Sequence, residues 1–380
     1  MPIHSKLPDV GTSIFAVMSG LARETGAINL SQGFPNFDCP KPLKDLVYKH
    51  MIAGDNQYAP MPGVPALRQS LAQKYRRLHG CDIDPDTEIT ITAGATQALF
   101  TAITALVDRG QEVIIFEPAY DSYVPSIRLC GATPIPYKMQ PPEYKIDWER
   151  VESMITPKTK MIIINTPHNP SGQVLLEEDL LALQGIALRH DLIFMFDEVY
   201  EHLIFDGIPH FSALRYPELY RKSVVVYSFG KTYHNTGWKM GYTIAPEELT
   251  REIRKVHQFN VFSVNTPIQH ALADYVNNEA WYSALPGFYQ EKRDLFVDIL
   301  RQTRFEPVDC KGTYFQLASY RTISEEDDLS FAKRITREYG VACIPVSAFY
   351  VDKSDFKVVR FCFAKTPDVL EAAGERLIKI

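Results

Sequence analysis

The chain has 380 residues, 46% of them hydrophobic and 23% charged, which is the composition of an ordinary globular protein long enough for two domains. Its net charge of −6 and isoelectric point near 6.0 argue against a nucleic-acid partner, which requires a basic surface. No apolar stretch approaches the roughly 20 residues of a membrane helix, so we expect no membrane association. The opening residues, MPIHSKLPDVGTS, lack the apolar core of a secretory signal.

The six cysteines are scattered and include no C-x-x-C pair, which predicts free thiols and neither a zinc site nor a disulfide framework. Free thiols suit the reducing cytoplasm, where we expect the protein to reside. The ten histidines show no H-E-x-x-H spacing, so the sequence predicts no metal site.

After an N-terminal arm, apolar residues recur at helical spacing over residues 42–54 and 64–80. Short apolar runs then alternate with longer amphipathic runs. We expect strands over residues 88–94, 112–118, 160–167, 192–198, 223–230 and 240–246. Helices are expected over 95–107 and 177–190, and a further helix follows the strand 112–118 and ends at Cys130. Strands that are apolar throughout and separated by helices indicate a mainly parallel sheet that is covered on both faces.

After residue 246 the pattern of apolar residues changes, first to one typical of helices and then to a mixture of strands and helices. Strands are predicted over 312–320, 341–349 and 358–364, with a helix over 329–340 and a final helix opened by Thr366 as its cap. This mixture indicates a smaller α+β domain. We therefore divide the chain into an arm (1–41) that packs with the small domain, a large domain (42–280) and the small domain (281–380).

In doubly wound sheets, ligands bind beyond the carboxyl ends of the strands. The small residues Gly94, Ala95 and Thr96 follow the first strand and open a helix, whose backbone N–H groups form an anion site. The later strands are followed by an aromatic ring, a carboxamide, a carboxylate and an amine, on Tyr120, Asn169, Asp197 and Lys231.

Two alternative ligand sites lack the glycines that their motifs require. The GKT at 230–232 does not close a P-loop, because the first glycine of that motif would fall on Val225. A dinucleotide-binding dehydrogenase is excluded because the chain has no G-x-G-x-x-G.

Each strand-end residue alone has an ordinary role as a turn, a helix cap or a packing residue. As a set, the phosphate cradle, aromatic plate, carboxamide, carboxylate and amine match one ligand, pyridoxal 5′-phosphate. The signature of a protein that binds this cofactor is a lysine for its aldehyde and an aspartate for its pyridine nitrogen. The residues thus predict a lysine nucleophile acting on a carbonyl cofactor.

Four stretches, NTPHNPSG, FDEVYEHLIF, SFGKTYHNTGWKMGY and VRFCFAK, resemble the class I pyridoxal-phosphate-dependent aminotransferases. SQGFPNFDCP, NQYAPMPGVPALR, TAGATQAL and RKVHQFNVFSVNTP resemble more narrowly the bacterial methionine aminotransferases, which are close to the kynurenine/glutamine transaminases. The resemblance runs from about residue 12 to the end. It implies fold type I, with a mainly parallel sheet of the seven-stranded type in the large domain, and a homodimer with shared active sites.

The resemblance also assigns the parts of the cofactor. It implies a Schiff base on Lys231, a protonated pyridine nitrogen held by Asp197, a ring stacked on Tyr120, a phenolic oxygen bound by Asn169 and Tyr200, and a phosphate bound by Ala95, Thr96, Ser228, Lys239 and the partner subunit's Tyr58.

For the substrate, the resemblance implies that Arg360 forks the α-carboxylate, a geometry that guanidinium suits, with help from Asn169 and Gly33. Phe15 and, from the partner subunit, Phe262 match positions that line the side-chain pocket. Thr96 and Ser263 depart from residues found in kynurenine transaminases, which weakens a preference for kynurenine.

The expected reaction is ping-pong transamination of a neutral or aromatic amino acid, methionine first, with a 2-oxo acid, through pyridoxamine phosphate. Lys231 is the expected proton carrier. A carbon–sulfur β-lyase uses the same lysine, and release of pyruvate and thiol from cystathionine would identify one. A non-catalytic binding protein is the other alternative, against which the intact lysine, aspartate and arginine argue.

Overall fold

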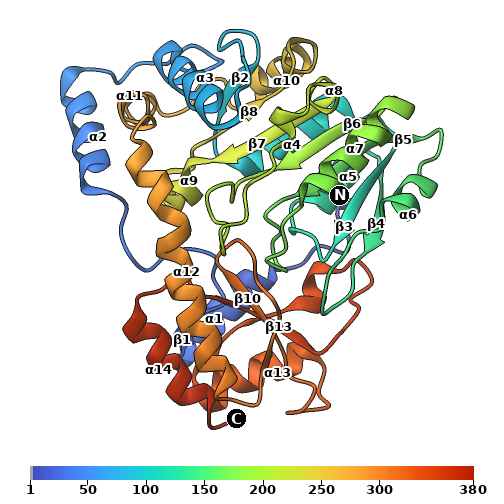
Figure 1. The fold of residues 1–380 in the computed structure, drawn as a ribbon, viewed down its shortest axis with the longest axis vertical. Coiled ribbons are helices and arrows are strands. Elements are labelled where there is room, and N and C mark those ends of the chain that lie inside the picture. Colours follow the sequence, from blue (N-terminus) through green and yellow to red (C-terminus); the bar gives the residue numbers. More distant parts are fainter. Residues whose placement is uncertain (1–2) are drawn as a thin grey trace.

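Seven strands form the central sheet of the large domain in the computed structural model, which describes residues 3–380 (Figure 1). Their order across the sheet is β2 (Ile89–Thr92), β8 (Gly241–Ile244), β7 (Ser223–Ser228), β6 (Ile193–Asp197), β5 (Thr159–Asn165), β3 (Glu112–Glu117) and β4 (Thr133–Lys138). Neighbouring strands are parallel except at β8, which runs antiparallel to β2 and β7. The predicted mainly parallel sheet is confirmed.

The edge strand β4 was not predicted from the sequence. Pro134 and Pro136 interrupt its run, and proline is a turn signal in most contexts. At the edge of a sheet a strand has one side without a partner, so the missing N–H groups cost no ladder hydrogen bond. The register with β3 is continuous from Glu112–Thr133 to Glu117–Lys138.

Helices cover both faces of this sheet (Figure 1). One face packs alternate strand residues such as Val113 and Met195 against α4 (Ala95–Leu106), α5 (Tyr123–Leu129) and α10 (Glu247–Asn260). On the other face lie α3 (Pro65–His79) and α7 (Glu177–Arg189). The remaining helices of this domain are α2 (Lys41–Ala53), α6 (Trp148–Ser153), α8 (Pro217–Tyr220), α9 (Phe229–Thr232) and α11 (Thr266–Tyr275).

The small domain contains an antiparallel sheet in the order β12 (Ile344–Pro345), β13 (Val358–Cys362), β10 (Phe315–Ser319) and β9 (Glu306–Pro307). Its helices are α12 (Glu279–Arg301), α13 (Asp328–Arg334) and α14 (Pro367–Leu377). The N-terminal arm carries α1 (Ile14–Thr25), and its strand β1 (Ile28–Asn29) pairs in parallel with β11 (Val341–Ala342). This pairing joins the arm to the small domain.

Three details of the small domain differ from expectation. The predicted strand 341–349 is two two-residue strands followed by a 3₁₀ turn at Val346–Phe349. The predicted helix 329–340 ends as a π-helical segment, Ile335–Tyr339. Thr366 precedes α14 as expected, but its hydroxyl accepts a hydrogen bond from Asn36 Nδ2 (3.2 Å) and makes none to the helix backbone.

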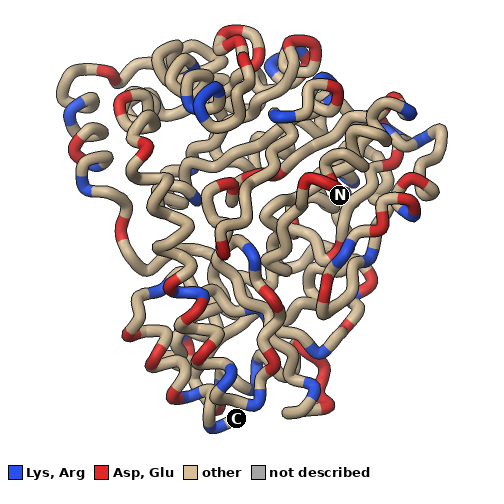
Figure 2. Tube along the Cα trace, viewed as in Figure 1, with Lys and Arg blue, Asp and Glu red and all other residues tan. Residues whose placement is uncertain are grey.

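Charged residues of both signs are interspersed along the chain trace (Figure 2). Among the helices described for residues 3–380, none is long and apolar enough to cross a membrane.

Candidate active site

A cavity of about 230 Å³ lies at the carboxyl edge of the large sheet, between the two domains. Except for Tyr58 and Phe262, every residue that the sequence analysis assigned to the site lines it: Phe15, Gly33, Ala95, Thr96, Tyr120, Asn169, Asp197, Tyr200, Ser228, Lys231, Lys239 and Arg360. The strand directions explain this convergence. Because β8 is antiparallel, its start, rather than its end, lies at this edge, and Gly241 pairs with Ser228 and Thr92. Lys239 therefore stands beside the residues that follow β2 and β7.

The N-terminus of α4 forms one wall of the cavity. A Cβ on Gly241 would lie 2.8 Å from the backbone N of Ala95, so only glycine lets β8 approach the helix start this closely. Gly94 has φ of +80° and lies against the Lys239 side chain. The Thr96 hydroxyl hydrogen-bonds the Tyr120 hydroxyl (3.2 Å). Free N–H groups at a helix start, next to a lysine, constitute an anion site.

Asp197 ends β6 and is buried. Burial raises the pKa of its carboxyl to about 6, opposed by the hydrogen bond that the Tyr123 hydroxyl donates to Oδ2 (2.6 Å). A carboxylate in this setting gains from a cationic partner in the cavity, because an unpaired buried charge is costly. The sequence analysis predicted no role at the site for Tyr123, because nothing in DSYVPS distinguishes it from a tyrosine that packs in the core.

Lys231 lies in α9, directly after β7. Its Nζ donates to the Tyr314 hydroxyl (2.6 Å) and to the Gly33 carbonyl (3.2 Å). Burial lowers the pKa of the Lys231 amine to about 8. About a tenth of the amine is therefore unprotonated at pH 7, far more than in an ordinary lysine, and the free amine is the form that acts as a nucleophile. Tyr314, a second partner missed by the sequence analysis, comes from the small domain.

Arg360 occupies the middle of β13 and is buried. Its Nη1 donates to Asn169 Oδ1 (2.8 Å) and its Nη2 to the Ser31 carbonyl (3.2 Å), and the guanidinium stacks on the Phe315 ring (3.9 Å). Among residues 3–380 no carboxylate lies within ion-pair distance of it, and its Nε has no partner. Burial lowers the pKa of Arg360 to about 10. A buried guanidinium that lines a cavity without a counter-ion is suited to an anionic ligand.

Gly33 and Asn165 hold neighbouring parts of the wall in place. A Cβ on Gly33 would come within 2.7 Å of the Phe315 ring, so glycine is required where the N-terminal arm passes this ring. Asn165, which the sequence analysis passed over, donates to the Asp197 carbonyl (2.8 Å) and accepts from the Asn169 backbone N–H (2.7 Å). Its position at the end of a buried strand, four residues before Asn169, was the available signal.

Tyr58 and Phe262 lie outside the cavity. Their rings pack edge to face with centroids 5.5 Å apart, and the two residues are 82% and 44% exposed. The assignment of these two residues to a partner's site stays a prediction.

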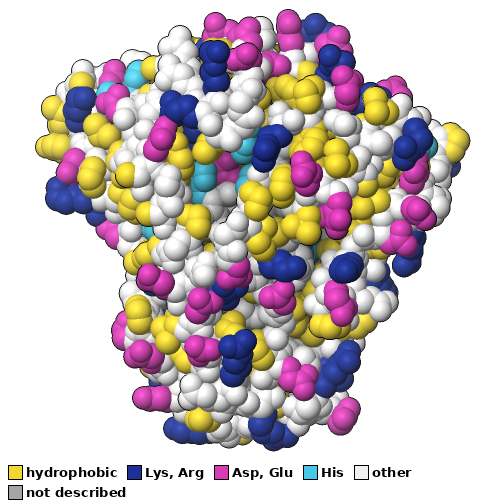
Figure 3. Space-filling view, viewed as in Figure 1, with side chains coloured by type: hydrophobic (Ala, Val, Ile, Leu, Met, Phe, Trp, Pro, Cys, Tyr) yellow, Lys and Arg dark blue, Asp and Glu magenta, His cyan; other side chains and the backbone are white. Residues whose placement is uncertain are grey.

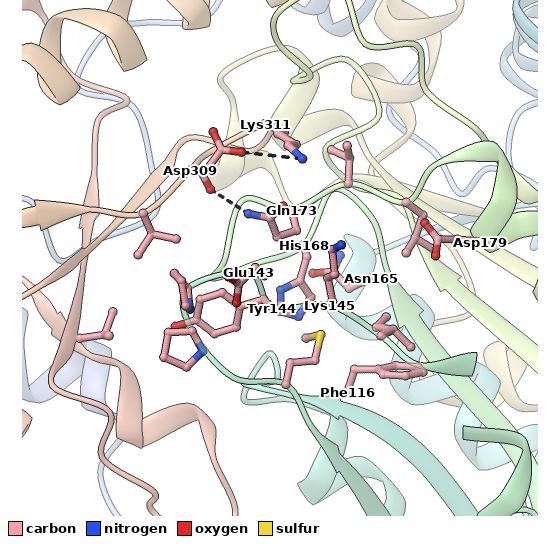
Figure 4. A pocket seen from close by; sticks show the side chains of 18 of the residues that line it. Phe116, Glu143, Tyr144, Lys145, Asn165, His168, Gln173, Asp179, Asp309 and Lys311 are labelled. Atoms are coloured by element: carbon pink, nitrogen blue, oxygen red, sulfur yellow. Dashed lines mark hydrogen bonds and ion pairs between the residues drawn. The ribbon is translucent and has the colours of Figure 1, made fainter. Parts of the chain in front are cut away.

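A larger cavity, of about 890 Å³, has Asn165, His168 and Gln173 in its lining (Figure 4). It shares Asn165 with the first cavity. Gln173 there donates to the Asp309 carbonyl (2.8 Å), joining the two domains across it. None of the residues assigned to the site from the sequence lines this larger cavity. Its lining includes the ion pair between Lys311 and Asp309 (3.7 Å), whose side chains are 37% and 70% exposed.

The donor set of the smaller cavity fits pyridoxal 5′-phosphate. The helix start with Lys239 suits the phosphate, Tyr120 offers a ring, and buried Asp197 suits a cationic nitrogen. Lys231 supplies an amine whose pKa is lowered to about 8. The phenolic oxygen of the cofactor would have Asn169 and Tyr200 for partners.

Comparisons with known proteins agree with this fit. The sequence profile described as aminotransferase class I and II matches residues 25–377. The chain is 50% identical to the methionine aminotransferase of Escherichia coli (strain K12), covering 98% of this chain and 97% of the relative. It is 34% identical to the Homo sapiens kynurenine–oxoglutarate transaminase 3, covering 97% of this chain and 88% of that protein.

A solved Escherichia coli structure, described as having a methionine aminotransferase function, superposes with a TM-score of 0.98 at 49% identity and covers 100% of both chains. Family, fold and site geometry lead to one conclusion. The chain belongs to the class I and II aminotransferases and is a pyridoxal-phosphate-dependent aminotransferase.

Proposed function

We propose that this aminotransferase takes the amino group from a neutral amino acid, methionine first, and passes it to a 2-oxo acid. The observation that carries the proposal is the shortage of cations at the site. The cavity is lined by Lys231, Lys239 and Arg360 as its only cationic side chains within residues 3–380. Arg360 suits the α-carboxylate and Lys239 a phosphate, so a side-chain carboxylate would have no counter-ion.

Two arginines that the sequence left unassigned could have supplied a further cation. Arg128 lies 3.8 Å from Asp9, and neither it nor Arg23 lines the cavity. The apolar surface near Arg360 comes instead from Phe15 and Phe315, whose rings lie 5.3 Å and 3.9 Å from its guanidinium. A thioether packs well against aromatic edges. The Escherichia coli relative named methionine aminotransferase adds support.

The roles of the chain's own residues follow from their placement. Arg360 and Asn169 bind and orient the α-carboxylate. With the cofactor bound, the Lys231 amine would accept the proton that leaves the substrate α-carbon and would hold it for its return. When bound, pyridoxal phosphate supplies the carbonyl that takes up the amine and the ring that withdraws electrons from the α-carbon. Asp197 would hold the ring nitrogen in its protonated form, and the Tyr123 hydroxyl donates a hydrogen bond to Asp197. The 2-oxo acid half-reaction uses the same groups in reverse order.

We also propose that the enzyme is a cytoplasmic homodimer. Large apolar side chains stand exposed on α2, in the segment that follows it and near residue 260, namely Tyr48, Met51, Ile52, Tyr58, Phe259 and Phe262. Hydrophobic side chains are visible on the surface over α2, at the left of Figure 3. An exposed apolar group of this kind is typical of an interface. The six free cysteines suit a reducing compartment.

The substrate proposal is tested with single-turnover half-reactions of the holoenzyme, followed by absorbance, with methionine, phenylalanine, glutamine, histidine and aspartate. We expect methionine to give the highest kcat/KM and aspartate the lowest. A higher kcat/KM for aspartate than for methionine would contradict the proposal and would require a cation donated by another subunit.

A further inference from the structure

His50, Asp55 and His270 meet on the outside of the large domain, away from both cavities. One ligand atom of each lies within 4.8 Å of the others, and all three side chains are partly buried. His50 and His270 belong to α2 and α11, which pack side by side at the upper left of Figure 1, and Asp55 follows the end of α2. The sequence offered no signal for this cluster, because its histidines come from distant segments.

The local fold brings Asp55 back onto His50. His50 lies in the last turn of α2, and Gly54, at φ of +96°, ends the helix in the left-handed conformation that glycine tolerates. The Asp55 backbone N–H then donates to the His50 carbonyl (3.1 Å), and the Asp55 carboxylate lies 2.7 Å from His50 Nδ1. The His270 ring stacks on His50, with centroids 5.2 Å apart and planes inclined by 22°.

A second carboxylate holds the far side of the His50 ring. Asp274 lies one turn after His270 on α11, and its Oδ2 is 3.1 Å from His50 Nε2. Lys49 Nζ is 3.4 Å from the same oxygen. Histidines that bind a metal through one nitrogen commonly donate the other N–H to a carboxylate, which fixes the tautomer and the ring orientation. His50 with Asp274 has this arrangement.

We propose that His50, Asp55 and His270 bind a divalent transition-metal ion, Zn²⁺ being the probe of choice, with Asp274 orienting His50. Two imidazoles and one carboxylate suit zinc and its neighbours, whereas calcium and magnesium prefer sites made of oxygen ligands. The ion replaces the hydrogen bond between His50 Nδ1 and Asp55, and the Nε2 contact with Asp274 is kept. Water completes the coordination.

Such an ion would tie α2 to α11. It would also fix the start of the stretch from Asp55 to Ala59, which already contacts the segment before and at the start of α11. Thr266 Oγ1 donates to the Gln57 carbonyl (2.6 Å), and Ser263 Oγ donates to the Ala59 carbonyl (3.0 Å). The bound ion is therefore structural, and it stabilises the segment that presents Tyr58.

The test uses the chelator-treated holoenzyme, titrated with Zn²⁺ by calorimetry and checked by metal analysis after dialysis. We expect one Zn²⁺ per chain and a higher melting temperature with the ion. His270→Gln should abolish both effects, and Asp274→Asn should weaken binding by about 10–100-fold, the range seen when an outer-shell partner is removed. His190→Gln, a change at a histidine paired with Glu152, is the matched control and should bind as the wild type does.

Three further measurements identify the ligands of the ion and check the fold of the variants. Co²⁺ should bind without a thiolate charge-transfer band, because no cysteine belongs to the site; such a band would mean that a cysteine binds the ion and would overturn the proposal. Circular dichroism and cofactor absorbance show whether His270→Gln and a second variant, Asp55→Asn, are folded. Absence of stoichiometric binding, or binding that survives in both folded variants, would mean that His50 is merely a histidine hydrogen-bonded between two carboxylates.

Discussion

Lys231 illustrates how burial prepares one side chain for chemistry. No carboxylate lies within ion-pair distance of its amine among residues 3–380, and its partners are a tyrosine hydroxyl and a carbonyl. Desolvation disfavours the charged ammonium, and this effect dominates the lowered pKa. Lys239 lines the same cavity next to the helix start, where a cation is the useful group for a phosphate.

Labelling of the cofactor-free chain should follow the titration of Lys231. We expect pyridoxal phosphate followed by borohydride to modify Lys231 at a rate that rises about tenfold per pH unit below pH 8 and levels off above it, because the free amine reacts. Peptide mapping by mass spectrometry after labelling across a pH series measures this. Lys231→Ala is the control and should take up no label at this peptide. Label found on Lys239 alone would show that the two lysines had been assigned the wrong way round.

Tyr123→Phe should weaken cofactor binding without harming the fold. The hydroxyl that it removes donates to Asp197, and this hydrogen bond lowers the Asp197 pKa. Without it the carboxyl stays protonated to a higher pH, and the ring nitrogen of the cofactor loses its charged partner. A hydrogen bond to a charged group is worth about 1.5–3 kcal/mol, so we expect an affinity loss of roughly 10-fold or more.

Fluorescence titration with pyridoxal phosphate between pH 5 and pH 8 tests this prediction. The loss of affinity at low pH should set in at a higher pH in Tyr123→Phe than in the wild type. Tyr320→Phe, which removes a buried tyrosine hydroxyl far from the site, should behave as the wild type does. Identical pH profiles for Tyr123→Phe and the wild type would show that Tyr123 only packs.

Helix α3 is joined to the segment after β6 by a buried ion pair. Lys74 Nζ lies 2.7 Å from Glu201 Oε1, and the side chains are 2% and 4% exposed. The Tyr75 hydroxyl also donates to Glu201 (3.0 Å) and contacts the Tyr242 hydroxyl (2.7 Å) on β8. The pair therefore connects a covering helix to the segment after Asp197, which carries Tyr200.

Breaking this pair from one side should be costly. Lys74→Met leaves the Glu201 carboxylate buried without its cation, so we expect the free energy of unfolding to fall by about 3–5 kcal/mol. Urea unfolding of the holoenzyme measures the change. Asp45→Asn, which removes the exposed pair with Lys41 (79% and 61% exposed), should cost about 1 kcal/mol or less. In the double variant Lys74→Met/Glu201→Met most of the lost free energy of unfolding should be regained, because no buried charge is left without a partner. Equal losses in Lys74→Met and Asp45→Asn would mean that the buried pair does not contribute to stability.

At the scale of the whole molecule, the smaller cavity is completed by both domains. Asp197 and Lys231 come from the large sheet, whereas Arg360 and Phe315 come from the small domain and Gly33 from the arm. Tyr58 and Phe262 are exposed beside α2 and α11 and do not reach this cavity. These two residues account for the proposal that a second copy of the chain contributes to each site.

Subunit mixing tests the shared site. A hybrid of a Lys231→Ala chain and a Tyr58→Ala chain should have one doubly damaged and one intact site. If half of the dimers are hybrids after random exchange, about a quarter of the wild-type activity should return, although each variant alone is impaired. Transamination is measured after mixing and after proof of exchange by native mass spectrometry. Activity that stays at the sum of the two separate variants would place Tyr58 outside the partner's site.

The sequence by itself determined the covered parallel sheet and most of the lining of the smaller cavity. Long apolar strand runs require burial on both faces, and polar residues after such runs collect at one edge, which is where Asn169, Asp197 and Lys231 lie. The family motifs in the same stretches predicted the identity of the cofactor and the type of reaction. These signals are local, and each can be read within about fifteen residues.

Only the tertiary structure decided the features that depend on contacts between segments far apart in the sequence. β4 forms because a sheet edge tolerates Pro134 and Pro136, which look like breakers in sequence. Tyr123 and Tyr314 become partners of Asp197 and Lys231 through chain crossings that no spacing records. His50 meets His270 because α2 and α11 lie together. The pKa changes of Asp197, Lys231 and Arg360 arise from burial, a property that a residue acquires only when the whole chain has folded around it.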